Sequence, residues 1–432
     1  MRKIEGQCPR EWPWTCTAKI ADLTPHHKRT CCRGCGSERL NGFLSLGPQP
    51  LANGFLRDPA EFATEAFYPL DVYFCESCSL VQLLDVIDPE VLFRDYIYVT
   101  GTSETMAAHN ARYAETVAEL LALEPGDLVV EAASNDGSLL KQFQKTGVRA
   151  LGVEPARNLA EVARAGGVET VEWFFNSDAA ARLRDAYGPA KAVIANNVLA
   201  HVDDTCDFLK GARQLLAEDG LAIFEIPYLG ELLGRLEYDT IYHEHLCYFS
   251  VIALRKLCEA AGLAIARIDR VNVHGGSLRI YAGLSREHGA TVFDWERSER
   301  QSGLDRLSTY EQFAAAVENH RHTLRGFLCD LRSRGRSLAA YGAPAKGNTL
   351  LNYCGLDATT IPFTVDRNER KIGLFTPGAH IPVRPVGALL EDRPDEVLIL
   401  AWNFSQEIMR QQESYRAQGG RFITPLPEPQ LN

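Results

Sequence analysis

Two pairs of cysteines have the spacing of a zinc site. Cys32 and Cys35 form one C-x-x-C pair, and Cys75 and Cys78 form a second pair after a gap of 39 residues. Each C-x-x-C turn presents two thiolates, and two such turns complete the tetrahedral coordination of Zn²⁺. Four thiolates leave no open position for a substrate, so we expect a structural zinc. Five other side chains are alternative ligands: Cys8, Cys16, Cys31, His26 and His27.

Carboxylates follow two predicted strands in the middle of the chain. Residues 127–132 form an apolar run that contains Glu131, and Glu154 ends the next run, residues 149–154. Ligands of parallel sheets bind at the carboxyl ends of the strands. A carboxylate at the position of Glu154 can accept hydrogen bonds from both ribose hydroxyls of a nucleoside. The pattern therefore predicts a nucleoside-containing ligand, with an NAD-binding unit or a simple strand–helix turn as alternatives.

Small and polar residues after the first of these strands suit a close approach of the backbone to this ligand. They are Ala133, Asn135, Asp136 and Gly137. Phe174 and Phe175 lie between the predicted strands at residues 149–154 and 192–196, where their rings could flank an adenine or simply pack in the core.

A third group of residues has the composition of a proton-transfer site. Tyr242, Glu244 and His245 lie within four residues, and His201 follows the predicted strand at residues 192–196. Asn197, directly after the same strand, is a candidate contact of the nucleoside-containing ligand. Histidine titrates near neutral pH, and a neighbouring carboxylate can tune its pKa. The spacing is not H-E-x-x-H, so a catalytic zinc is not expected. A polar helix start with hydrogen-bonded histidines is the alternative.

Two glycine-containing turns suggest contacts with a second ligand. His274, Gly275 and Gly276 form a predicted hairpin turn over the proton-transfer site, although an ordinary Gly-Gly turn is the alternative. The turn at residues 342–347 follows a predicted strand and carries Lys346. Backbone amides at a helix N-terminus and a lysine can together bind a diphosphate. A Rossmann-like docking domain without a ligand is the alternative for this part of the chain.

Strands that alternate with helices must position these groups, which indicates an α/β fold with parallel, doubly wound sheets. Strands are expected at residues 127–132, 149–154, 192–196 and 221–226, and again at 337–341, 361–366, 396–401 and 421–424. A polar helical connection is expected at residues 287–336. The domains are predicted as an extension (1–30), a zinc-binding domain (31–92), a central nucleoside-binding domain (93–300) and a second Rossmann-like domain (301–432).

Composition excludes several classes of protein. The 432 residues are 46% hydrophobic and 23% charged, which is typical of globular chains. A net charge of −11 argues against a nucleic-acid partner, because phosphate neutralisation needs a basic surface. No run of 18 apolar residues and no signal peptide is visible, so we expect a cytoplasmic protein without a membrane partner.

The central segment resembles class I S-adenosylmethionine methyltransferases, whose first motif is E/D-x-G-x-G-x-G. Ala133 and Asn135 stand where that motif has glycines, whereas Glu131, Asp136, Gly137 and Glu154 are retained. More specifically, the chain from Cys32 onward resembles the three-domain nucleotide-sugar C-methyltransferases of antibiotic deoxysugar pathways. The matching segments are the two C-x-x-C pairs, 50–53, 68–70, 96–98, 135–137, 225–230, 244–245, 273–276, 341–343, 345–346, 376–385 and 401–403.

The resemblance implies a reaction and a role for each site residue. The expected enzyme uses S-adenosylmethionine to methylate carbon 3 of a nucleotide-linked 4-keto deoxysugar through an enolate. His245 is then the base, with Glu244 beside it, and the enolate or sugar hydroxyl contacts come from Tyr96, or its rival Tyr98, and from His201 and Tyr242. The expected substrate contacts are His274, Gly275, Gly276, Lys346 and Asn403. Alternatives are a methyltransferase for another small molecule and a non-catalytic, zinc-containing nucleotide-binding scaffold.

Overall fold

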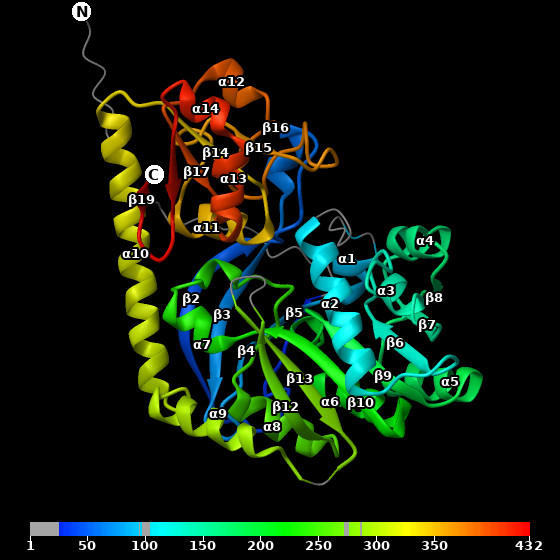
Figure 1. Ribbon diagram of the computed structural model, residues 1–432. Helices are drawn as coiled ribbons and strands as arrows, with labels where there is room; N and C mark the ends of the chain where they lie inside the picture. The colour runs from blue at the N-terminus through cyan, green and yellow to red at the C-terminus, as the bar shows by residue number, and fades with distance from the viewer. Residues whose placement is uncertain (1–25, 95, 97–103, 272–275, 286) are drawn as a thin grey trace, which may run out of the picture.

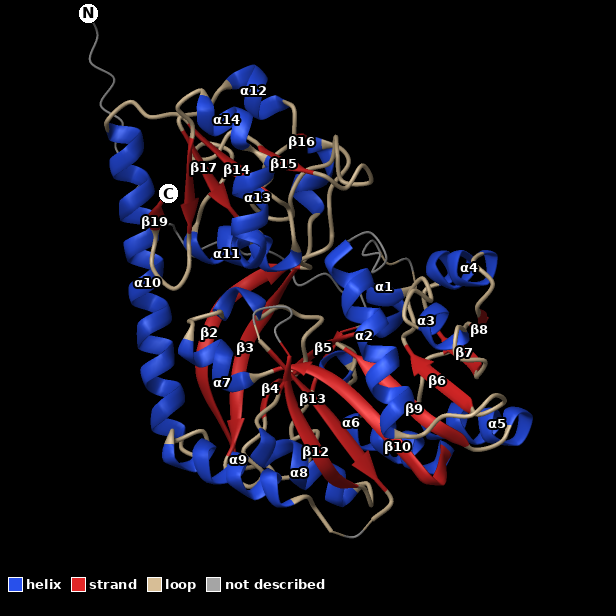
Figure 2. Cartoon of the chain, viewed as in Figure 1, coloured by secondary structure: helices blue, strands red, loops and turns tan. Residues whose placement is uncertain are grey.

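Within the described residues, three sheets of four or more strands organise the chain. Figures 1 and 2 show how the helices lie around these sheets. The computed structural model describes residues 26–94, 96, 104–271, 276–285 and 287–432. Strand order and strand direction differ among the sheets, and each sheet forms the centre of one domain.

The zinc-binding domain is built on antiparallel strands in the order β11-β4-β3-β2. Along β3, Tyr68, Leu70, Val72 and Phe74 are buried and the residues between them are more exposed, as expected for a sheet with one covered face. The elements are β1 (His26–Lys28), β2 (Leu40–Pro50), η1 (Pro59–Thr64), β3 (Phe67–Cys75), β4 (Val81–Leu83), β5 (Asp85–Ile87) and α1 (Pro89–Phe93).

Two of the strands in this region join segments that the sequence does not place together. Strand β1 pairs with β5, so His26–Lys28 are part of this domain although they fall within the expected extension. Strand β11 (Cys247–Tyr248) comes from the following domain and pairs with β4. The zinc-binding domain and the segment just after His245 therefore share one sheet.

The central domain has the strand order β12-β13-β10-β9-β6-β7-β8. The strands β10, β9, β6, β7 and β8 are parallel, and β13 is antiparallel between β10 and β12. Every residue of β6 is buried, as expected for a parallel strand covered on both faces. Chain order reverses between β6 and β9, and ligands of such sheets bind in the crevice at this point.

The elements of the central domain are α2 (Glu104–Leu120), β6 (Leu128–Ala132), α3 (Leu140–Gln144), β7 (Arg149–Val153), α4 (Arg157–Ala165), β8 (Glu169–Val171), α5 (Ser177–Tyr187), β9 (Ala190–Asn196), η3 (Leu199–His201), α6 (Thr205–Leu215), β10 (Leu216–Pro227), α7 (Leu229–Gly234), η4 (Tyr238–Thr240), α8 (Val251–Ala260), β12 (Ala264–Val271) and β13 (Ser277–Gly283).

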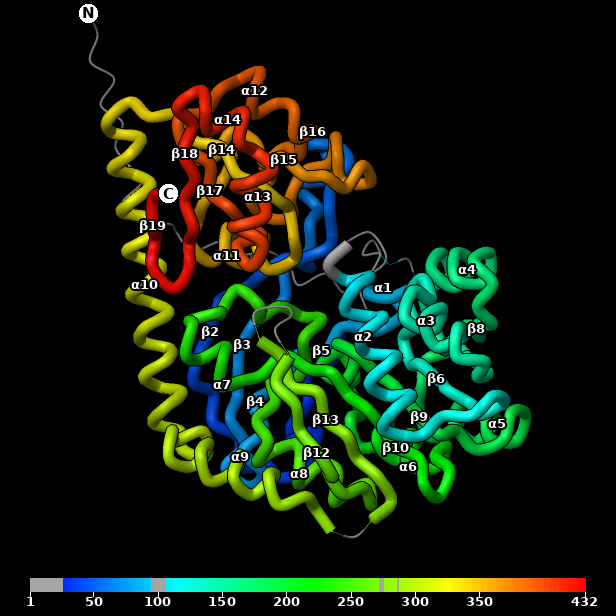
Figure 3. Tube along the Cα trace, in the orientation of Figure 1, coloured from blue at the N-terminus to red at the C-terminus, as the bar shows by residue number. Residues whose placement is uncertain are grey.

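Two helices connect the central domain with the C-terminal domain, as the polar helical pattern predicts. They are α9 (Ala290–Gln301) and the 27-residue α10 (Leu307–Ser333). Helix α10 packs along β2, where Tyr310 contacts the rings of Phe43 and Phe74. The tube in Figure 3 follows this yellow helix past the blue zinc-binding strands to the C-terminal domain.

The C-terminal domain has the strand order β16-β15-β14-β17-β18-β19. The first five strands are parallel, and β19 closes an antiparallel hairpin with β18. This order has its reversal between β14 and β17, as in a dinucleotide-binding fold. The elements are β14 (Leu338–Tyr341), α11 (Ala345–Cys354), β15 (Thr364–Asp366), β16 (Val383–Pro385), α12 (Ala388–Asp392), β17 (Glu396–Ile399), η5 (Trp402–Phe404), α13 (Ser405–Gln411), α14 (Glu413–Ala417), β18 (Arg421–Thr424) and β19 (Gln430–Leu431).

None of the helices in the described ranges has both the length and the apolar character needed to cross a bilayer.

Candidate active site

A cavity of about 700 Å³ lies where the three domains meet. Its lining includes the turns after β6 and β9 of the central domain and the turns after β14 and β17 of the C-terminal domain. Asn53 and α1 of the zinc-binding domain line it as well. The two switch points of the two parallel sheets therefore open into the same space.

The turn after β6 explains how the chain departs from the glycine-rich motif. Ala133 has φ +50° and Asn135 has φ +52°, in the left-handed region where glycine is usual. Asn135 is among the residues that tolerate this region best, whereas Ala133 adopts it at a cost of roughly 1–2 kcal/mol. The backbone conformation of the motif is thus kept without the glycines. Helix α3 follows this turn and begins at Leu140.

Glu154 joins the first two turns at the carboxyl edge of the central sheet. One carboxylate oxygen accepts a hydrogen bond from the Asn135 amide at 2.7 Å, and the other accepts from the Ala156 amide at 2.8 Å. Burial raises the pKa of Glu154, and these two backbone bonds oppose the rise. Each carboxylate oxygen has a second lone pair, and Glu154 lines the cavity, so the side chain can accept further hydrogen bonds.

Glu131 is buried at the floor of the same region. Its Oε2 atom has no hydrogen-bond partner among the described residues, and the side chain lines the cavity. Burial raises its pKa well above the usual range, and the nearby Asp136 and Glu154 add to the rise. A ligand that carries positive charge would stabilise these carboxylates, and S-adenosylmethionine carries both an ammonium and a sulfonium group.

Of the other expected cofactor residues, Phe174, Phe175 and Asn197 line the cavity, whereas Asp136 and Gly137 are not among its lining residues. Phe175 is largely buried and packs edge-on against Phe208. The Arg94 guanidinium lies over the Phe174 ring. Asn197 has φ +55°, and its buried Oδ1 atom has no described partner.

His245, Tyr242 and His201 come together at the end of β9. The Nε2 atom of His245 lies 2.9 Å from the Tyr242 hydroxyl, and its Nδ1 atom lies 2.8 Å from the Thr240 carbonyl oxygen. The rings of His201 and His245 are 4.8 Å apart. Burial, and then the proximity of His245, lower the pKa of His201 well below its ordinary value, so His201 is neutral. The predicted cluster of aromatic and imidazole groups is therefore present at the predicted strand end.

The Glu244 side chain contacts a different part of the cavity wall from the side chain of His245. Its carboxylate accepts hydrogen bonds from the Asn53 amide at 2.7 Å and from the Tyr96 hydroxyl at 3.3 Å. Burial raises the pKa of Glu244 to about 7, against the opposing effects of Asn53, Tyr96 and Lys371. A carboxyl group with this pKa can exchange a proton, or accept one from a hydroxyl, at neutral pH.

The position of Tyr96 is defined by Asn158 at the start of α4. The backbone amide of Tyr96 donates to the Asn158 side chain, which in turn donates to the Tyr96 carbonyl oxygen. Sequence reasoning missed Asn158, because no motif connects two residues that are 62 positions apart.

Lys346 lies at the start of α11, as predicted, but its neighbours are not those of an isolated phosphate site. Its ammonium donates to Asn403 at 2.5 Å and lies 3.8 Å from the centre of the Trp402 ring. Burial lowers the pKa of Lys346 to about 8, and the carboxylates of Asp239 and Glu237 oppose this effect. Lys346 and Asn403 thus form one unit at the switch point of the C-terminal sheet.

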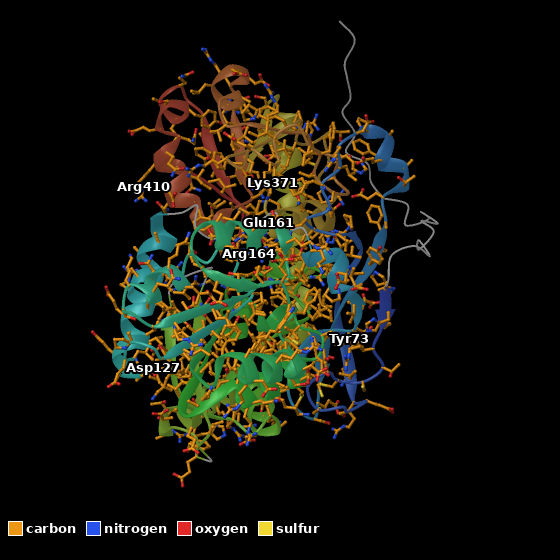
Figure 4. All side chains as sticks on the ribbon, turned by 90° about the vertical axis from the view of Figure 1, so that its right-hand side faces the viewer. Tyr73, Asp127, Glu161, Arg164, Lys371 and Arg410 are labelled. Atoms are coloured by element: carbon orange, nitrogen blue, oxygen red, sulfur yellow. The ribbon has the colours of Figure 1, made fainter. Side chains whose placement is uncertain are left out.

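Three buried polar side chains near the cavity were not singled out by the sequence patterns. Lys371, labelled in Figure 4, extends from the C-terminal domain, donates to the Ala343 carbonyl oxygen and lines the cavity. His109 and Arg279 hold the two oxygens of Glu225 at 3.2 and 2.8 Å. Glu225 lies in one of the segments that resemble the family, so the sequence pointed to this residue. No sequence signal pointed to its partners, His109 and Arg279.

Some predicted site residues lie outside the described residues, namely Tyr98, His274 and Gly275. Gly276 follows them with φ +125°, and it lines the cavity.

The four predicted cysteine ligands form one cluster. One possible ligand atom from each of Cys32, Cys35, Cys75 and Cys78 lies within 4.8 Å of the others, and Gln82 donates to the Cys32 sulfur at 3.0 Å. Four sulfurs in this arrangement fit tetrahedral zinc. Among the alternative ligands, His26 bonds Asp85, His27 faces Asp203, and Cys31 is not part of the cluster. Cys8 and Cys16 precede the described residues.

Comparisons with known proteins agree with this three-part organisation. Residues 32–93 match a family described as a zinc binding domain, residues 106–268 a methyltransferase domain and residues 272–427 a C-methyltransferase C-terminal domain. The C-methyltransferase NovU of Streptomyces niveus is 38% identical over 403 residues, which are 93% of this chain and 96% of NovU.

Solved structures of more distant proteins overlap with part of the chain. Magnesium protoporphyrin IX methyltransferase (ChlM) of Synechocystis PCC 6803 with bound SAM is 17% identical and has a TM-score of 0.33, covering 44% of this chain and 88% of that chain. The CcbJ methyltransferase of Streptomyces caelestis is also 17% identical and has a TM-score of 0.32, covering 41% of this chain and 90% of that chain. Likeness at this level carries no weight in assigning a function.

Proposed function

The chain belongs to the family of C-methyltransferases that includes NovU, and on that premise we propose that it methylates carbon 3 of a nucleotide-linked 4-keto deoxysugar. The coarser activity, S-adenosylmethionine-dependent C-methylation by a zinc-binding enzyme, follows from the family and its domains. The sugar, its nucleotide and the position of the methyl group are the proposal.

The observation that carries this proposal is the cavity into which the switch points of the central and C-terminal sheets both open. The central sheet presents Glu131 and Glu154 to it, and the C-terminal sheet presents Lys346 and Asn403. A substrate with a nucleotide at one end and a reactive carbon at the other can span this space. His245 lines the same cavity.

S-adenosylmethionine supplies an electrophilic methyl group on its sulfonium. Glu131, Glu154 and the turn at Ala133–Gly137 would hold it, because they offer carboxylates for its cationic groups and its ribose. Asn197 follows β9, at the switch point where the methyl group would face the substrate carbon. Correct placement of the reacting atoms accounts for a large part of the rate in such transfers.

The chain must remove a proton from a carbon atom next to a ketone. The Thr240 carbonyl can only accept a hydrogen bond, so the Nδ1 atom of His245 carries the proton and Nε2 is the basic nitrogen. This nitrogen faces the Tyr242 hydroxyl. We assign His245 as the base and Tyr242 as the hydroxyl that passes the proton to it.

The negative charge that develops on the keto oxygen needs hydrogen-bond donors. Tyr96 lies at the cavity wall beside Glu244, and the neutral His201 lies beside His245. These two side chains are assigned to the enolate oxygen or to the neighbouring sugar hydroxyl. The carboxylate of Glu244 accepts a hydrogen bond from a sugar hydroxyl and so orients the ring.

Incubation with a panel of nucleotide-linked 4-keto sugars and methyl-labelled S-adenosylmethionine tests the proposal. We expect one methyl group to be transferred to carbon 3 of a panel member, identified by mass and by NMR of the product. Label transfer to a different small molecule, with no nucleotide sugar as substrate, would contradict it.

A further inference from the structure

The zinc-binding domain forms one wall of the active site and holds the segment that carries Glu244 and His245. Strand β11 directly after this segment pairs with β4, and the Leu83 amide donates to the Leu246 carbonyl oxygen at 3.0 Å. Before the segment, the His243 ring donates to the Pro69 carbonyl oxygen at 3.1 Å. The zinc-binding domain therefore contacts the chain on both sides of Glu244 and His245.

A further contact from the zinc-binding domain reaches the Glu244 side chain, which lines the cavity. The Asn53 amide donates to the Oε1 atom of Glu244 at 2.7 Å, across 191 residues of chain. Asn53 itself lies on a turn in which the Gly54 amide donates to the Leu51 carbonyl oxygen. Asn53 lines the cavity next to Glu244, so its amide is placed for this carboxylate and not for bulk solvent.

The C-terminal domain anchors the same turn. The side chain of Asn348, which is 1% exposed on α11, donates to the Ala52 carbonyl oxygen at 2.7 Å. The residue before Asn53 is thus fixed by one domain, while Asn53 itself contacts another. The three domains meet in the chain of hydrogen bonds from Asn348 through the 52–53 turn to Glu244.

We propose that Asn53 is a positioning residue that holds Glu244 toward the substrate in its ionised form, so that the zinc-binding domain takes part in the reaction as well as in folding. This inference rests on the role given to Glu244 above. An amide N–H donates to a carboxylate and stabilises it over the neutral acid. Without Asn53, the 4% exposed Glu244 would retain the cost of burial and lose its shortest described hydrogen bond.

Other charged and titratable groups lie around Glu244, and they must stay unchanged when Asn53 is replaced. Tyr96 donates to the second carboxylate oxygen, and Lys371 of the C-terminal domain lowers the pKa of Glu244 through its charge. His243 and His245 flank Glu244 in the chain, and the His201 ring bonds the Glu244 backbone. Asn53 can be changed while all five groups are kept.

Asn53→Asp is the sharpest variant, because it keeps the size of the side chain and removes the donor. Two carboxylates within hydrogen-bond distance share a proton, so the Glu244 pKa should rise. The matched control is Asn41→Asp, since Asn41 donates to the exposed Glu76 at 2.9 Å in the same domain. Asn53→Ala removes the donor without adding charge, and zinc content and S-adenosylmethionine affinity report whether each variant is folded.

Carbon-13 NMR of glutamate-labelled protein measures the Glu244 pKa without turnover, with Glu244→Gln assigning the resonance. We expect a rise of at least about one unit in Asn53→Asp, a smaller rise in Asn53→Ala and no change in Asn41→Asp. The acidic limb of the pH profile of kcat/KM for the nucleotide sugar should shift together with the Glu244 pKa. A one-unit rise of this pKa from 7 lowers kcat/KM at pH 7 by about fivefold.

Two outcomes would contradict different parts of the proposal. An unchanged Glu244 pKa in folded Asn53→Asp and Asn53→Ala protein overturns the role of Asn53, whatever the substrate is. The other outcome is that the Glu244 pKa rises in the Asn53 variants, while turnover is unaffected both in these variants and in Glu244→Gln. This outcome refutes the role of Glu244 in the proposed function and, with it, the role of Asn53 in the reaction.

Discussion

The imidazole of His245 and the phenol of Tyr242 form one hydrogen-bonded pair, with 2.9 Å between Nε2 and the hydroxyl oxygen. Because Nδ1 faces the Thr240 carbonyl oxygen at 2.8 Å, the pair has a defined direction: Tyr242 donates and His245 accepts. The basic nitrogen of His245 is thus reached through a hydroxyl group. The pair follows η4 and precedes β11, which fix it at both ends.

Tyr242→Phe should remove the route to the basic nitrogen while keeping the aromatic ring. We expect kcat to fall by roughly 10²-fold or more, the range of general acid–base effects. Binding of S-adenosylmethionine, followed by calorimetry, should stay unchanged. A Phe variant with near-normal kcat would show that Tyr242 only packs against His245.

Glu154→Ala should weaken binding of S-adenosylmethionine by roughly 1.5–3 kcal/mol, the usual range for hydrogen bonds to a charged group. The reason is the loss of the acceptor for the ribose hydroxyls, together with the contact that holds the Asn135 turn. Glu172→Ala is the matched control, because Glu172 follows the next strand, β8, but pairs with Arg164. Equal calorimetric affinities for the two variants would place the donor site elsewhere.

Purified protein should contain about one zinc per chain, bound by the four clustered thiolates. Cys75→Ser should lower the zinc content and the melting temperature, since the site ties the turn after Cys32 to β3. Cys31→Ser is the control, because Cys31 is adjacent in sequence and outside the cluster. Metal analysis that finds no zinc in folded, active wild-type protein would contradict the assignment.

The strand ends were predictable because their signals are local. An apolar run followed by a small or acidic residue marks β6 and β7, and Glu131 and Glu154 lie where that pattern predicts. The C-x-x-C pairs are equally local, and the four cysteines form the expected cluster. Ala133 was harder, because its left-handed conformation is visible only in the backbone.

Contacts between domains could not be predicted from the sequence. Asn53 and Glu244 are 191 residues apart, and neither local pattern indicates the other. Lys346 has the spacing of a phosphate ligand, but the charges of Asp239 and Glu237 reach it from another domain. Such neighbours are set by how the sheets pack, and the spacing of residues along one segment carries no information about this.

The role of His245 as the base is tested most directly by following the carbon 3 proton and not the methyl group. A nucleotide-linked 4-keto sugar is incubated in deuterium oxide with the enzyme and S-adenosylhomocysteine, and exchange at carbon 3 is followed by NMR. We expect exchange by the wild type, none by His245→Asn, and retained exchange with slower turnover in His201→Asn. Exchange by His245→Asn at near the wild-type rate, with loss of exchange in His201→Asn, would contradict the assignment of His245 as the base.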